Sequence, residues 1–118
     1  MKKIVGLILL VFLSFGVRAS HIMGGEITWE CIKDPLNPDV GKYIFTMKLY
    51  RDCDGISLPT NNQTLNVWNH PTVSTISLQF ISNTDISPDC DVTNSGNPAL
   101  DCSTNPVGAV EEYIYQSL

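Results

Sequence analysis

Apolar and polar side chains alternate over Lys42–Arg51, the longest such run in the chain. One face of the run carries four apolar side chains, Tyr43, Phe45, Met47 and Leu49. A period of two residues predicts a half-buried β-strand, because successive side chains of a strand point to opposite faces. The run stops at Asp52–Gly55, a cluster of turn-forming residues that contains Cys53. This strand end can therefore be anchored by a disulfide.

Four other segments show alternation: Glu26–Ile32, Thr64–Asn69, Val73–Ile81 and Val107–Leu118. In the first of them, Ile27, Trp29 and Cys31 are expected on the inner face. The segment Lys33–Gly41 is rich in proline and aspartate, so it is expected to join the first two strands as a hairpin. Past the N-terminal segment, no run has apolar residues at helical spacing. The pattern predicts an all-β fold, an immunoglobulin-like sandwich.

The chain ends within its last strand signal, at Val107–Leu118. A small sandwich whose last strand has no neighbour would expose an open edge that invites aggregation. We therefore expect residues 20–118 to be an incomplete domain, truncated at the C-terminal end, and the N-terminal part of a longer protein.

The N-terminal residues have the features of a secretory signal peptide. Lys2 and Lys3 are followed by the apolar run Ile4–Phe15, and Ala19 stands at the expected cleavage site. The run is shorter than the roughly 20 residues of a membrane-spanning helix. We expect residues 1–19 to be removed, residues 20–118 to form one β-sandwich domain, and the protein to be exported to the cell surface or beyond it, with no membrane span after cleavage.

Removal of the signal peptide makes the chain more acidic. The whole chain has a net charge of −5, and after cleavage four basic residues remain against twelve acidic ones, a net charge of −8. Phosphate backbones are bound chiefly by Lys and Arg, so nucleic acid is not an expected partner. An anionic membrane surface is disfavoured for the same reason.

The cysteines are expected to form disulfides, because the exported context favours them. If the first two strands form a hairpin, Cys31 lies beside the turn and Cys53 at the far end, roughly 30 Å away at 3.3 Å per residue. A disulfide tolerates only about 7 Å between Cα atoms, so Cys31 and Cys53 cannot pair. Cys90 and Cys102 both lie in the polar segment Ser82–Pro106, which is too long to sit in a compact domain without a tether. We therefore predict a Cys90–Cys102 bridge.

Three motifs together resemble a known family: S-H-I-M-G-G-E-I-T-W-E-C at Ser20–Cys31, L-Y-R-D-C-D-G at Leu49–Gly55 and V-E-E-Y-I-Y at Val110–Tyr115. The chain is similar to the amino-terminal domain of large secreted surface proteins of Bacteroidetes. These proteins carry polycystic-kidney-disease-type repeats or a gliding-motility-associated, type IX secretion sorting domain at the far end. The resemblance implies a further segment with adjacent cysteines downstream, which would supply partners for Cys31 and Cys53.

No segment carries a recognisable catalytic motif, so no catalytic residue and no cofactor are predicted. A terminal His21 would chelate copper only after cleavage past Ser20, which is disfavoured.

Asp52 and Asp54 lack the third ligand of a calcium loop and are expected to cap a turn. A structural calcium site is a minor alternative for the aspartates of the polar loop, Asp85, Asp89, Asp91 and Asp101. Glu111 and Glu112 point to opposite faces of a strand, which excludes a cooperating pair.

Trp68 is the candidate ligand contact, because it lies on the polar face of its predicted strand, opposite Leu65 and Val67. The predicted function is a non-enzymatic, exported β-sandwich module with an architectural or adhesive role, whose partner is a surface glycan or protein. The alternative is a carbohydrate-binding module of a secreted polysaccharide-degrading enzyme.

Overall fold

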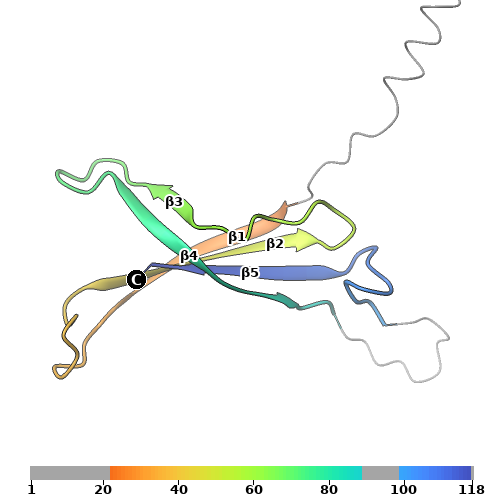
Figure 1. Cartoon of the computed structure of the whole chain (residues 1–118), viewed down its shortest axis with the longest axis horizontal. Coiled ribbons are helices and arrows are strands. Elements are labelled where there is room, and N and C mark those ends of the chain that lie inside the picture. The colour runs from red at the N-terminus through yellow and green to blue at the C-terminus, as the bar shows by residue number, and fades with distance from the viewer. Residues whose placement is uncertain (1–21, 89–98, 118) are drawn as a thin grey trace, which may run out of the picture.

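The computed structural model describes residues 22–88 and 99–117, and within these ranges the strands form one antiparallel sheet (Figure 1). The strands are β1 (Ile22–Cys31), β2 (Tyr43–Asp52), β3 (Gln63–Asn66), β4 (Thr75–Asp85) and β5 (Val110–Gln116). Their order across the sheet is β1-β2-β5-β4-β3. The prediction of an all-β fold is confirmed, and the curled sheet is compatible with a fragment of a β-sandwich.

The first two strands form the predicted hairpin. Cys31 lies opposite Tyr43 and Gly25 lies opposite Leu49. β1 begins at Ile22, four residues before the predicted start, and it passes close to β2 at Gly25. A Cβ atom at Gly25 would lie 2.8 Å from the Leu49 side chain and from the Lys48 carbonyl oxygen. Glycine therefore permits the close approach of the two backbones here.

β5 is the last of the described strands, and it is inserted between β2 and β4. The expectation that the last strand has no neighbour is therefore wrong. Tyr115 lies opposite Met47 on one side and opposite Phe80 on the other. Side chains of directly opposed residues share one face of a sheet. The apolar face of β2 therefore continues across β5 and β4.

The buried core occupies only part of this apolar face. Leu78, Tyr113 and Tyr115 are almost completely buried, and partly buried apolar side chains pack against them: Phe45, Met47, Leu49, Leu58, Leu65, Ile76 and Phe80. The Tyr115 hydroxyl donates a hydrogen bond to the Pro59 carbonyl at 2.7 Å. The segment that follows β2 therefore covers the centre of the sheet.

The part of the apolar face on β1 is not covered by the described residues. Ile27 is 50% exposed and Trp29 is 68% exposed. The sequence correctly placed Ile27 and Trp29 on one face of their strand. This face also carries Phe45 and Met47, because Trp29 lies opposite Phe45 and Ile27 opposite Met47. Their expected inner position is wrong for this chain, since the covering segment packs over β4 and β5.

Strand boundaries differ from the predictions where turns intervene. β3 ends at Asn66, Val67 donates its N–H to the Ser74 carbonyl at 2.8 Å, and Asn69 has a φ of 63°. Trp68 therefore lies in a turn and not on the polar face of a strand. β4 continues to Asp85, into the segment predicted as a loop, because its end pairs with β5.

The described disulfide joins Cys53 to Cys102, with 5.1 Å between their Cα atoms. The predicted Cys90–Cys102 bridge is therefore wrong, and so is the expectation of a downstream partner for Cys53. The physical reason is the pairing of β2 with β5, in which Cys53 donates its N–H to the Ala109 carbonyl at 3.0 Å. This pairing places Cys53 beside the segment that precedes β5, and that segment contains Cys102.

Cys90 lies outside the described residues, and within them Cys31 is a free thiol. The exclusion of a Cys31–Cys53 bridge is confirmed, because Cys31 lies opposite Tyr43 at the other end of the hairpin. A downstream partner for Cys31 stays a prediction.

Candidate binding surface

The uncovered apolar side chains of the hairpin form a candidate binding surface. We call the exposed side chains of Ile27, Trp29 and Tyr43 the open face; Tyr43 is 55% exposed. A shallow depression of about 370 Å³ lies beside Ile27 and extends to Met47 and Leu49. A second depression, of about 660 Å³, lies at the hairpin end between Trp29 and Tyr43. A patch of apolar and aromatic side chains beside depressions is typical of surfaces that bind other molecules.

The other end of the same strands is fixed by a buried ion pair. The Arg51 guanidinium lies 2.7 Å from the Glu111 carboxylate, and the two side chains are 9% and 12% exposed. Glu111 also accepts a hydrogen bond from the Asn83 amide at 2.7 Å. Arg51 further donates to the carbonyl oxygens of Asp52 and Gly55, at 3.0 Å each. The ion pair therefore ties β2, β5, β4 and the turn after β2 together.

Sequence reasoning did not identify this ion pair, although a signal was present. Arg51 alternates with Leu49 and Met47 in its strand, so it points to the same face as they do. Glu111 shares a face with Tyr113 and Tyr115 for the same reason. A base and an acid that both point to the apolar face are expected to pair, because an unpaired buried charge is costly.

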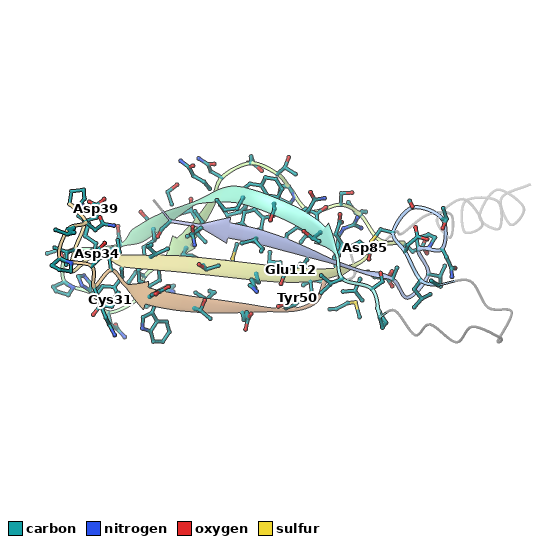
Figure 2. All side chains as sticks on the ribbon, turned by 90° about the horizontal axis from the view of Figure 1, so that it is seen from below. Cys31, Asp34, Asp39, Tyr50, Asp85 and Glu112 are labelled. Atoms are coloured by element: carbon teal, nitrogen blue, oxygen red, sulfur yellow. A yellow bond between two sulfur atoms is a disulfide. The ribbon has the colours of Figure 1, made fainter. Side chains whose placement is uncertain are left out.

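The opposite face of the sheet is polar and carries an acidic network. Lys48 lies 3.3 Å from Glu112 and 4.0 Å from Glu26, and the Tyr50 hydroxyl lies 3.4 Å from Glu26. The side chains of Tyr50 and Glu112 are labelled in Figure 2. The hydrogen bond and the charge of Glu112 raise the pKa of Lys48 above its ordinary value. Glu112 thus lies on the face opposite to Glu111, and the prediction that they do not cooperate is confirmed.

Trp68 is 85% exposed, in the turn between β3 and β4. His70 holds this turn, because its Nδ1 accepts hydrogen bonds from the N–H groups of Thr72 and Val73, at 3.2 and 2.9 Å. A largely apolar depression of about 430 Å³ lies next to the turn and is lined in part by Val67 and His70. The exposure of Trp68 agrees with the predicted role, and the ligand contact itself stays a prediction.

The aspartates considered as metal ligands mostly serve as hydrogen-bond acceptors in turns. Asp52 accepts a hydrogen bond from the N–H of Asp54 at 3.0 Å, which confirms the predicted turn capping. Asp85 accepts one from the N–H of Cys102 at 2.7 Å, and Asp101 accepts them from Ser103 and Thr104. These bonds engage both carboxylate oxygens of Asp85 and Asp101 and one oxygen of Asp52.

Hydrogen bonding also changes the acidity of two of these groups. Bonds from the Ser87 side chain and the Cys102 backbone lower the pKa of Asp85, and bonds from Ser103 and Thr104 hold the pKa of Asp101 well below its ordinary value. Asp89, Asp91 and His21 lie outside the described residues. Among the residues that are described, no three His, Cys, Asp or Glu side chains gather as a metal site. The calcium site stays a prediction.

Comparison with protein families, with curated proteins and with solved structures finds no match for this chain. In residues 22–88 and 99–117, no helix has the length and apolar character needed to cross a membrane.

Proposed function

We propose that the chain is a non-enzymatic, exported β-sheet module, an immunoglobulin-like sandwich component with an architectural or adhesive role. The observation that carries this proposal is the open face. Ile27, Trp29 and Tyr43 are each at least half exposed on a sheet whose other end is held by a disulfide and a buried ion pair. An apolar surface on a rigid support is suited to binding, because little conformational entropy is lost when a partner docks.

The Cys53–Cys102 disulfide supports the exported location. Disulfides persist in oxidising compartments and are rare in the cytosol. The expected signal peptide at residues 1–19 agrees with this interpretation. The expected partners are a surface protein or a glycan.

The two tryptophans allow a direct experiment, because both are exposed and they lie in different places, Trp29 on β1 and Trp68 in the turn between β3 and β4. The purified exported protein is attached to beads, and the retention of the beads under flow is measured on surfaces coated with protein or with polysaccharide. We expect retention on a protein-coated surface that is lost with Trp29→Ala and kept with Trp68→Ala. Equal retention of both variants and the wild type would contradict a role for the open face.

A carbohydrate-binding module is the second candidate, and the exposure of Trp68 beside an apolar depression favours it. Aromatic side chains at interfaces offer a flat apolar surface with little flexibility. In this case a glycan array would give binding that disappears with Trp68→Ala and persists with Trp29→Ala. The same pair of variants therefore separates the two functions.

A further inference from the structure

β1 is a long outer strand with no strand beyond it in the described part of the chain. It lies at one edge of the sheet, next to β2 alone (Figure 2). The strand has ten residues and no proline, whereas β3 at the other edge has four residues. A long edge without proline can pair with an additional strand.

The backbone of β1 has hydrogen-bonding groups that point away from β2. Ile32 donates its N–H to the Lys42 carbonyl at 2.9 Å. Antiparallel strands alternate between hydrogen-bonded and non-hydrogen-bonded pairs. The pairing register continues without interruption from Cys31 back to Gly24, so the N–H and C=O groups of Cys31, Trp29 and Ile27 are directed outward. These groups offer a template for another strand.

The side chains of β1 specify which strand would fit. Ile27 and Trp29 lie on the open face, and Glu26 and Glu30 are exposed on the polar face. Glu26 and Glu112 both form an ion pair with Lys48. Glu30 has no ion pair with any described residue. β1 contains no Lys or Arg. A partner strand would therefore meet apolar side chains on one face and a net negative charge on the other, because a single Lys48 lies among three glutamates.

This charge argues against a second copy as the occupant. Two β1 strands paired with each other would bring Glu26 and Glu30 of both copies onto one face, with no basic residue in either strand. Like charges on neighbouring strands are destabilising, and opposite charges are stabilising.

We propose that the outer edge of β1 binds an extended segment of another polypeptide in which apolar residues alternate with Lys or Arg. The added strand continues the sheet beyond β1. Its apolar side chains cover Ile27 and Trp29, and its basic side chains lie beside Glu26 and Glu30. The inference rests on the proposed binding function and names the chemical class of its partner.

The probe is a capped decapeptide that alternates valine with lysine, added to the purified full chain carrying Trp68→Phe. Trp29 is then the single tryptophan, since the sequence contains two. We expect saturable binding with a blue shift of Trp29 emission, because the added strand covers the indole. A peptide with glutamate in place of lysine should bind at least about tenfold more weakly, because like charges then face each other. A central proline in the lysine peptide should abolish binding, since it disrupts strand pairing.

Charge reversal of the edge provides the matched test. Glu26→Lys combined with Glu30→Lys should weaken binding of the lysine peptide about tenfold and strengthen that of the glutamate peptide. Asp54→Lys adds the same kind of charge in an exposed turn outside β1 and should leave both affinities unchanged. Circular dichroism of each variant verifies that the sheet is retained.

Several results would overturn the proposal. The absence of any Trp29 shift would do so, as would equal binding of the lysine, glutamate and proline peptides. Self-association of the chain with a blue shift of Trp29 in the absence of peptide would identify a second copy as the occupant. Bead retention that depends on Trp29 without peptide binding would leave the proposed function intact and remove this inference alone.

Discussion

The two halves of the apolar face have the same alternating sequence pattern, but one half is buried and the other is exposed. In the half formed by β4 and β5, Leu78 and Tyr115 have no exposed surface. In the other half, formed by β1, Trp29 is 68% exposed although it lies opposite Phe45 of β2 on the same face. Alternation thus determines which face a side chain occupies, and the segments that cover the sheet determine whether it is buried.

The covered half, together with the end of β2 that pairs with β5, also has the covalent and ionic links. Cys53–Cys102, Arg51–Glu111 and the bond from Tyr115 to Pro59 all join segments far apart in the sequence. The end of the hairpin at Cys31 has the ladder between β1 and β2, the turn that joins them and hydrogen bonds between Phe45 and Ser117. Among the described residues it has no disulfide and no buried ion pair. Stability should therefore be concentrated in the covered half, which leaves the open face available for binding.

The largest expected effect is the removal of the disulfide. Cys53→Ser combined with Cys102→Ser opens a link with a sequence separation of 49 residues. The chain-entropy model gives a loss of roughly 4 kcal/mol in the free energy of unfolding for a loop of this size. Urea unfolding followed by circular dichroism measures this loss. Cys31→Ser is the control and should change stability little, because Cys31 is a free thiol in the open half.

The next effect compares the two halves by core truncation. Leu78→Ala should lower the free energy of unfolding by about 3 kcal/mol, because a fully buried leucine leaves a cavity. Ile27→Ala, on the half-exposed side chain, should cost less than about 1 kcal/mol. Both values come from urea unfolding. Equal losses for the two variants would mean that the open half is covered in solution.

A smaller loss is expected from the ion pair. Arg51→Met should cost about 2 kcal/mol, because it leaves the buried Glu111 carboxylate without its charged partner. The double variant Arg51→Met and Glu111→Leu should recover much of this loss, since replacing both partners with apolar groups removes the unpaired charge. If the loss in the double variant equals the sum of the losses in the two single variants, the interaction between Arg51 and Glu111 does not contribute to stability.

The sequence predicted the hairpin and the strand faces because both depend on near neighbours. The alternation of Tyr43, Phe45 and Met47 is visible in a single run, and the loop at Lys33–Gly41 indicates the turn. The position of Trp29 on the same face as Phe45 follows from these two features. The turn at Asp52–Gly55 was also predicted, because its turn-forming residues are adjacent in the sequence.

The pairing of β2 with β5 could not be predicted, because strands that are distant in sequence carry no local signal of adjacency. The disulfide error follows directly from this limit. Cys90 and Cys102 are close in sequence, whereas Cys53 and Cys102 become close only through the β2–β5 ladder. The exposure of Trp29 has the same origin, since it depends on which segments cover the sheet.

The smallest effect concerns acidification of the turn that carries Cys102. Asp85 and Asp101 have pKa values below the ordinary 3.8, because hydrogen bonds from Ser87 and Cys102, and from Ser103 and Thr104, stabilise their ionised forms. A carboxylate with a lowered pKa in the folded state contributes stability that is fully present above its unfolded pKa and is lost as the pH falls through the folded pKa. This contribution should therefore be intact at pH 7 and should decline only below about pH 4.

The amide resonances of Cys102 and Thr104, followed by NMR as the pH falls, should shift with midpoints below 3.8. With Asp101→Asn the Thr104 shift should disappear while the Cys102 shift remains, because Cys102 donates to Asp85. Midpoints at or above 3.8 in the wild type would show that these hydrogen bonds do not persist in solution.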